Sequence, residues 1–258
     1  MQYFSLLLKV VCFLGLFSLL SCTNSNSSSI VIAVASSMQE ATKELIKSFE
    51  EESGIRCDLI IGSSGKLTAQ IVQGAPFDVF LSADTMYCRY LIDKDMASPI
   101  KRFQLTGSLV LLSPDHKVPL RLDQLSAIDF DFLTIANPET APYGLAAKGA
   151  LERLGLLQRL QGKIVYGESI GQVNQFIQTK AAQFGITSKS SLISYFDRDN
   201  ISWLEIDPLL HNPIIHGGVV LNRVKSPNNG VGDFLNYLES PAASAIFSKF
   251  GYTAVDNN

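Results

Sequence analysis

Residues 30–49 read IVIAVASSMQEATKELIKSF, an apolar run that changes abruptly into an amphipathic pattern. The run Ile30–Ala35 is continuously apolar, which is typical of a strand buried on both faces of a parallel sheet. Ser36 and Ser37 follow, and from Met38 onward apolar side chains recur at the spacing of a helix. The stretch therefore predicts a strand that leads directly into a helix, the unit from which α/β folds are built.

The same alternation of strand and helix continues along the chain. A second strand is expected at residues 55–61 and a third at 77–81, with a helix between them that starts near 62–65 and ends at Gly74. Two successive βαβ units of this kind imply parallel strands joined by right-handed crossovers. Later strands are expected at 109–112, 132–136, 163–166, 184–187 and 218–221, and later helices at 143–154, 171–179, 230–237 and 241–250.

The folded part is predicted to form two lobes. About 230 residues follow the N-terminal segment, which is more than one typical core contains. No linker separates the two sets of elements, so we expect interleaved lobes joined by crossover segments near residues 106–109 and 208–213. These crossovers place residues 30–107 plus 213–258 in lobe 1 and residues 108–212 in lobe 2.

The N-terminus carries the pattern of a bacterial lipoprotein. Residues 6–20 are almost entirely apolar, a run that is short for a membrane span but typical of a signal peptide. It ends in Leu-Leu-Ser-Cys, which resembles the lipobox, where the cysteine is acylated and becomes the new N-terminus. Residues 1–22 are therefore predicted to be a signal peptide with Cys22 as the lipidation site, and the polar residues 23–29 a tether. The protein is then expected to be lipid-anchored outside the cytoplasm, in the periplasm or on the outer face of the membrane; an uncleaved N-terminal anchor is the alternative.

Composition and motifs argue against several functions. With a net charge of -3 and no basic block, the chain lacks the features of a nucleic-acid-binding protein. It has no motif of a serine hydrolase, a nucleotide-binding loop or a zinc protease, and we expect it not to be an enzyme. The three histidines, His116, His211 and His216, lie at no metal-binding spacing. We interpret Cys57 and Cys88 as two separate buried residues, with a disulfide as the alternative.

Polar turns join strands to helices at four places where an anion could bind. Ser36-Ser37 and Ser63-Ser64 open helices in the first set of elements, and Pro142-Tyr143 and Ser169–Gly171 open helices in the second. A helix N-terminus offers unpaired N–H groups and a partial positive charge. Ligands of open α/β sheets bind at the carboxyl ends of the strands, where such turns meet. Any one serine here could be only a helix cap, but four turns together predict a shared site for a small anion.

The donors also restrict the kind of anion. A phosphate that carries a proton at neutral pH needs an acceptor such as a carboxylate, whereas backbone amides only donate hydrogen bonds. Asp84 is the one carboxylate that we expect to lie near these turns, and we interpret it as structural. The turns therefore favour a fully deprotonated dianion, namely sulfate, molybdate or tungstate.

Three stretches of the chain resemble the substrate-binding proteins of bacterial molybdate ABC transporters. They are residues 60–84, 137–148 and 166–170, and the similarity extends over nearly all of residues 30–252. The resemblance implies a type II periplasmic-binding-protein clamp, an α/β fold in which each of two lobes is a mixed sheet flanked by helices. It also implies a monomer that binds molybdate, and the nearly isosteric tungstate, and delivers it to the permease and ATPase subunits of an ABC importer.

The resemblance further implies which residues contact the ligand. Ser37 and Ser64 would each contribute a hydroxyl and an amide, and Tyr143 and Ile170 a backbone amide each. Molybdate would then be held through its oxygens, with no direct metal ligand and no cofactor. Some family members add a tyrosine hydroxyl at the position where this chain has Ser188, a shorter donor. Another oxyanion such as sulfate or phosphate is the alternative ligand, and an enzyme or sensor on the same fold is the alternative class.

Overall fold

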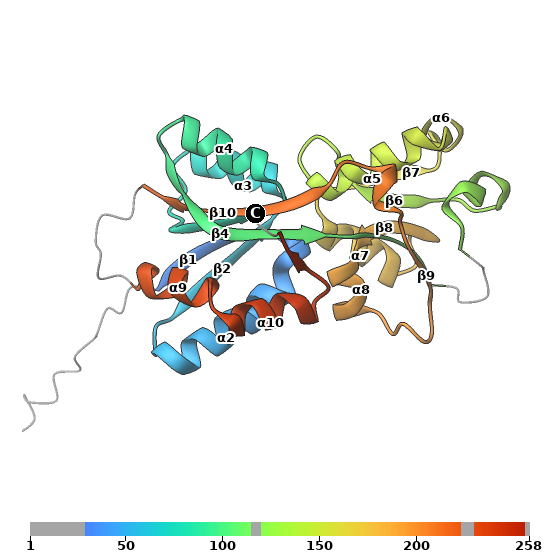
Figure 1. Cartoon of the computed structure of the whole chain (residues 1–258). Coiled ribbons are helices and arrows are strands. Elements are labelled where there is room, and N and C mark those ends of the chain that lie inside the picture. Colours follow the sequence, from blue (N-terminus) through green and yellow to red (C-terminus); the bar gives the residue numbers. More distant parts are fainter. Residues whose placement is uncertain (1–28, 115–119, 223–229, 256–258) are drawn as a thin grey trace, which may run out of the picture.

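The computed structural model describes residues 29–114, 120–222 and 230–255. The predicted signal peptide, Cys22 and residues 23–28 of the tether lie outside these ranges. Within them the chain forms two mixed β-sheets, each covered by helices, and the two halves lie side by side (Figure 1). In the described part of the chain, no helix is both long enough and apolar enough to cross a membrane. The predicted fold class, two α/β lobes that each contain a mixed sheet, is confirmed.

The first sheet has six strands in the order β11-β4-β10-β3-β1-β2. β1 pairs in parallel with β2 and β3, whereas β10 runs antiparallel to both β3 and β4. Helices α2, α9 and α10 cover one face of this sheet, and α3 and α4 cover the other (Figure 1). The bounds are β1 Ile30–Ala35, β2 Cys57–Gly62, β3 Val79–Ser82, β4 Ala97–Gly107, β10 Ile214–Leu221, β11 Thr253–Ala254, the 3₁₀ turn η2 Ser36–Met38, α2 Gln39–Ser53, α3 Ser64–Val72, α4 Thr85–Asp93, α9 Val231–Leu238 and α10 Pro241–Lys249.

The second sheet has five strands in the order β7-β6-β8-β5-β9. β6 pairs in parallel with β7 and β8, and β5 runs antiparallel to β8 and β9. Helices α5 and α6 lie on one side of this sheet and α7 and α8 on the other (Figure 1). The bounds are β5 Leu109–Ser113, β6 Leu133–Ala136, β7 Ile164–Gly167, β8 Phe184–Ser188, β9 Ser202–Glu205, α5 Pro142–Arg153, α6 Leu156–Arg159, α7 Ile170–Gln178, α8 Lys189–Tyr195, and the 3₁₀ turns η3 Leu122–Ala127 and η4 Pro208–Leu210.

Helix α2 is held firmly against the first sheet. Leu45 and Phe49 are buried in the core on its inner face, and Phe49 lies edge-on to Phe234 of α9 with 5.3 Å between the ring centroids. Gly54 ends the helix in the left-handed conformation, at φ 72°, which glycine adopts without the steric cost of a side chain. This packing fixes the start of α2 at the carboxyl end of β1.

The chain passes between the sheets twice. It leaves the first sheet after β4 ends at Gly107 and enters the second at Leu109, where β5 begins. It returns between Glu205, the end of β9, and Ile214, the start of β10. We call the six-stranded sheet with its helices the first lobe, and the five-stranded sheet with its helices the second lobe. The exact residue boundaries of the two lobes stay a prediction.

The two cysteines of the folded part are free thiols. Cys88 packs in the core between β3 and α4, and Cys57 begins β2 at the edge of the sheet. Burial, with smaller contributions from neighbouring carboxylates, raises the pKa of both thiols to about 12. The two thiols are separate, as interpreted, but only Cys88 is buried, because Cys57 lies half-exposed on an edge strand.

Candidate functional site

A small pocket lies where the carboxyl ends of strands from both lobes meet. Its free volume is about 10 Å³, far less than the 300–1,000 Å³ typical of pockets for organic ligands. The first lobe contributes the ends of β1, β2 and β3, and the second lobe contributes the starts of α5 and α7. The lining residues are Ala35, Ser36, Ser37, Ser63, Ser64, Ala83, Ala141, Pro142, Tyr143 and Ile170. Four of the five predicted contact residues therefore line one pocket.

Ser37 presents a free hydroxyl to this pocket. It lies in η2, the single 3₁₀ turn between β1 and α2, and is almost completely buried. Its Oγ has no hydrogen-bond partner among the described residues, and the same is true of the buried Ser63 Oγ. A buried hydroxyl without a partner costs stability, so two of them in one small cavity indicate a place built for a polar ligand. Ser63 is not among the predicted contacts. The sequence signal from which it could have been found is the Ser63-Ser64 pair between β2 and α3.

The Ser64 hydroxyl accepts one hydrogen bond within the protein and can donate its proton to a ligand. Ser64 is the first residue of α3, and its Oγ accepts a hydrogen bond from the Ala83 amide at 3.0 Å. The carbonyl of Ser64 accepts from Thr68 Oγ1 at 2.8 Å, which fixes the first turn of the helix. One of the two lone pairs of Oγ accepts this N–H, and the hydroxyl proton can be donated to an acceptor in the pocket.

Tyr143 and Ile170 bring two helix N-termini to the pocket from the second lobe. Tyr143 follows Pro142 at the start of α5, and Ile170 is the first residue of α7. Amides in the first turn of a helix have no partner within the helix. The start of α5 also lies very close to the sheet, because a Cβ on Gly144 would come within 2.1 Å of the Ala136 carbonyl oxygen. The tight contact holds the Tyr143 amide at the carboxyl end of β6.

Ser188 occupies a different place from the other predicted contacts. It is not among the residues that line the pocket. Its Oγ caps α8 by accepting from the Ser191 amide at 3.1 Å, and it lies 2.9 Å from Ser190 Oγ and 2.8 Å from Ser191 Oγ. This hydroxyl is therefore engaged within its own lobe, and a ligand contact would require it to exchange these partners.

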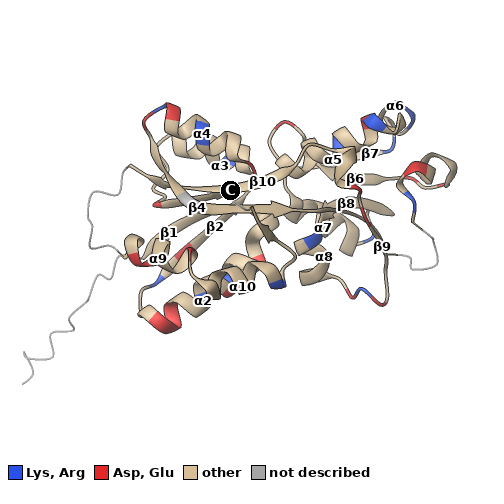
Figure 2. Cartoon of the chain, viewed as in Figure 1, with Lys and Arg blue, Asp and Glu red and all other residues tan. Residues whose placement is uncertain are grey.

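None of the described residues that line the pocket carries a charge. Lys and Arg, Asp and Glu lie mostly on the outer helices and loops of both lobes (Figure 2). Asp84, the carboxylate singled out in the sequence, caps α4 by accepting from the Met86 amide at 2.7 Å. Burial raises the pKa of Asp84, and its bond from Met86 partly offsets this. The structural interpretation of Asp84 agrees with this geometry, and the pocket presents neutral donors alone.

The two lobes touch around the pocket. The Gly65 amide at the start of α3 donates to the Thr140 carbonyl of the second lobe at 2.9 Å. Lys66 and Glu168 form an exposed ion pair across the same boundary at 2.8 Å, a kind of pair that contributes little to stability by itself. Direct backbone contact between the lobes means that this is the closed form of the clamp.

A buried histidine lies beside the pocket. The ring centroid of His216 is 5.8 Å from that of Tyr143 and 5.0 Å from that of Tyr252, and His216 Nδ1 lies 3.1 Å from the Leu105 carbonyl oxygen. Burial lowers its pKa to about 4, although the bond to Leu105 acts in the opposite direction. The folded protein therefore keeps this imidazole neutral at the pH where the unfolded chain protonates it.

The free energy of unfolding is expected to fall between pH 6.5 and pH 4 because of His216. In this window the unfolded state binds the proton and the folded state does not, so stability decreases as the pH falls, by on the order of 3 kcal/mol. Urea titrations of the wild type and of His216→Gln across this range check it. The variant should lose most of this pH dependence, whereas His211→Gln should keep it. Equal slopes for all three proteins would contradict the assignment.

The fold and the site together define a clamp that encloses a small solute between two lobes. A family model described as "Bacterial extracellular solute-binding protein" matches residues 30–253, and the chain belongs to this family.

Within this family the chain is similar to molybdate-binding proteins. It is 34% identical over 227 residues to the "Molybdate-binding protein ModA" of Rhodobacter capsulatus, covering 86% of this chain and 87% of that protein. The solved "Azotobacter vinelandii periplasmic molybdate-binding protein" superimposes with a TM-score of 0.81 at 28% identity, covering 88% of this chain and all of that one. The "Putative ABC transporter substrate-binding lipoprotein YvgL" of Bacillus subtilis is 28% identical over 87% of this chain and 86% of its own length. The resemblance seen in the sequence is confirmed.

Proposed function

We propose that this protein binds molybdate, and also tungstate, outside the cytoplasm and delivers it to the permease and ATPase subunits of an ABC importer. The relatives at 34% and 28% identity are molybdate-binding proteins by name, and they cover most of the chain. The observation in the structure that carries the proposal is the pocket itself. Two buried serine hydroxyls without partners share a small cavity with two helix N-termini and no charged side chain.

This donor set favours an anion without a proton. Helix N-termini and hydroxyls supply hydrogen bonds and partial positive charge to a dianion. Ser37 and Ser64 would donate from the first lobe, and the amides of Tyr143 and Ile170 from the second. Because no carboxylate lines the pocket, protonated phosphate would find no strong acceptor. Ser188 is not part of this set, because its hydroxyl is engaged in capping α8.

Binding and closure are coupled in the proposed mechanism. The ligand contacts both lobes and so stabilises the closed form over an open one, and the permease recognises the closed form. The protein acts as a monomer with no cofactor and no chemical step. Acylation at Cys22 would hold it near the permease through the short polar tether, and the similarity to a substrate-binding lipoprotein supports this anchor.

A thermal-shift screen of oxyanions tests the proposal. At a ligand concentration a hundred times the Kd, binding stabilises a protein by about 2.7 kcal/mol, which corresponds to roughly 5–10 °C for a chain of this size. Molybdate and tungstate are expected to raise the unfolding temperature by this amount, and phosphate is not. Stabilisation by phosphate or sulfate without molybdate would overturn the proposal.

A further inference from the structure

Helix α8 of the second lobe lies against the start of α2 in the first lobe. Ser190 Oγ donates across the boundary to the carbonyl oxygen of Ser37 at 2.5 Å. Tyr252 Oη, from the first lobe, donates to the same carbonyl at 2.7 Å. The turn that carries the Ser37 hydroxyl is therefore held from both lobes through its backbone carbonyl, while its own Oγ has no partner in the described chain.

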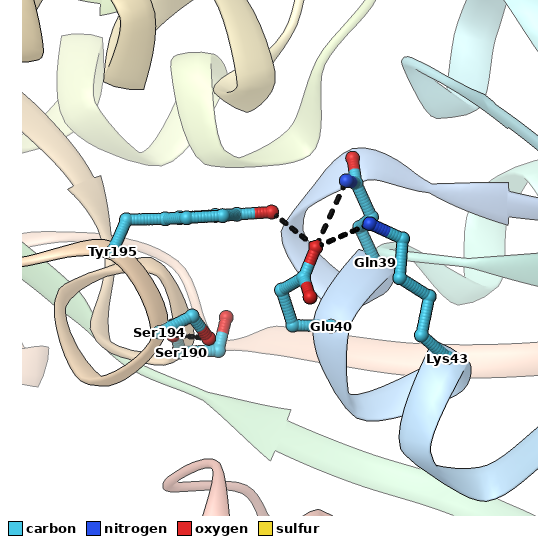
Figure 3. Close-up of polar contacts among 6 residues, drawn as sticks. All are labelled: Gln39, Glu40, Lys43, Ser190, Ser194 and Tyr195. Carbon is cyan, nitrogen blue, oxygen red and sulfur yellow. Dashed lines mark hydrogen bonds and ion pairs between the residues drawn. The ribbon is translucent and has the colours of Figure 1, made fainter. Parts of the chain in front are cut away.

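A second bond joins α8 to α2 itself. Tyr195 Oη, near the end of α8, donates to Glu40 Oε1 in the first turn of α2 at 2.7 Å. Figure 3 shows these two side chains pointing toward each other from the ribbons of the two lobes. The same Glu40 oxygen accepts from Lys43 Nζ at 2.7 Å and from Gln39 Nε2 at 3.0 Å, both on α2 itself. The first lobe thus holds the carboxylate in place, and Tyr195 supplies the only one of these three bonds that crosses between lobes.

The contact between Tyr195 and Glu40 is suited to influence closure. The acceptor is a charged carboxylate, and hydrogen bonds to charged groups are stronger than neutral ones. Burial raises the pKa of Glu40, but the bonds from Lys43 and Tyr195 outweigh this and lower it overall, so the carboxylate is ionised at neutral pH. Neither residue lines the oxyanion pocket. The pair can therefore change the stability of the closed form without changing the contacts to the ligand.

We propose that Tyr195 is a positioning residue for oxyanion binding: its bond to Glu40 is an interlobe latch that stabilises the closed clamp and so raises affinity. The proposal rests on the proposed function, since it assigns a role in binding at the same site. The apparent affinity of a protein is reduced when its binding-competent conformation is only partly populated. A latch that forms on closure increases the population of the closed conformation. Because the latch forms after the ligand has entered, it lowers the dissociation rate and leaves the association rate unchanged.

The chain offers a matched control for this latch. Tyr237 Oη donates to Ser48 Oγ at 2.6 Å, and Ser48 also belongs to α2. Tyr237 lies on α9, so this bond stays within the first lobe. Tyr195→Phe and Tyr237→Phe each remove one hydroxyl that is bonded to the same helix, but only the first removes a bond between lobes.

Calorimetry and stopped-flow binding of molybdate to the purified full chain test the latch. Tyr195→Phe is expected to weaken binding about three- to tenfold, through faster dissociation at an unchanged association rate. Tyr237→Phe is expected to leave affinity unchanged and to lower only the unfolding temperature. In a Glu40→Ala background, Tyr195→Phe should have no further effect on affinity, because its partner is gone.

The outcomes separate the latch from the proposed function. If the wild type binds molybdate and Tyr195→Phe binds it equally well, or if both tyrosine variants lose affinity equally, the latch is overturned and the ligand assignment stands. An undiminished effect of Tyr195→Phe in the Glu40→Ala background also overturns it. If the wild type does not bind molybdate but binds another oxyanion in the screen, the proposed function fails, and the same variants measured with that ion decide the latch.

Discussion

Replacement of Ser64 by alanine is expected to weaken molybdate binding by about tenfold or more. The hydroxyl is buried, and its oxygen already accepts from the Ala83 amide at 3.0 Å, so its proton is free to bond a ligand oxygen. A hydrogen bond to a charged group contributes about 1.5–3 kcal/mol, and each 1.4 kcal/mol corresponds to a factor of ten in affinity. Titration calorimetry with molybdate on the wild type and on Ser64→Ala measures the difference.

Ser53 provides the control for this substitution. Its hydroxyl also accepts a backbone N–H, from Ile55 at 3.1 Å, and it donates to the Phe49 carbonyl at 2.7 Å, at the far end of α2. Ser53→Ala therefore removes another serine hydroxyl that accepts a backbone N–H, at an exposed position away from the pocket, and it should change stability but not affinity. Unchanged affinity in Ser64→Ala, or an equal loss in Ser53→Ala, would show that the site is assigned wrongly.

The strands that the sequence predicts best are those buried on both faces. The predicted strand at residues 30–35 coincides with β1. A short, continuously apolar segment is stable when both of its faces are buried, as they are in the interior of a parallel sheet. The strand β4, Ala97–Gly107, was not predicted. It contains Pro99, Lys101 and Arg102, which are typical of a loop, and it is held by antiparallel pairing with β10 and β11. Helix α8 was missed for a similar reason, since its short serine-rich sequence is stabilised by contacts with the first lobe.

The site was predictable to the extent that it depends on strand order. Parallel strands bring their carboxyl ends to one edge, so the turns at Ser37, Ser64, Tyr143 and Ile170 converge as expected. The contacts that close the clamp were not predictable, because they join residues of different lobes that no local pattern relates. Ser188 illustrates the limit: the resemblance implies a ligand contact at this residue, and the structure shows its hydroxyl capping α8, so the ligand contact stays a prediction.

Replacement of Gly65 by alanine is expected to weaken molybdate binding about ten- to a hundredfold while leaving the fold intact or slightly more stable. A Cβ at this position would lie 2.9 Å from the Thr140 carbonyl oxygen and 3.0 Å from its Cα, in the opposite lobe. These are backbone atoms, so the contact is relieved by separating the lobes, and overpacking of this kind costs about 1–3 kcal/mol. Tyr87 Oη of the first lobe would also lie 3.0 Å away, but it is the end of a side chain that can shift. The larger part of the penalty therefore applies to the closed form, because an open clamp moves Thr140 away.

Stability and affinity should therefore change in opposite directions in Gly65→Ala. Alanine is favoured over glycine inside a helix by up to about 1 kcal/mol, and Gly65 lies in the first turn of α3. Gly149→Ala is the matched control, since a Cβ there meets nothing within 4 Å in α5; it should gain stability and keep its affinity. Calorimetry with molybdate, urea titration without ligand, and small-angle scattering with saturating molybdate measure the three properties. If Gly65→Ala binds as tightly as Gly149→Ala, the lobes do not need this close approach to hold the anion, and the closed clamp is not the binding form.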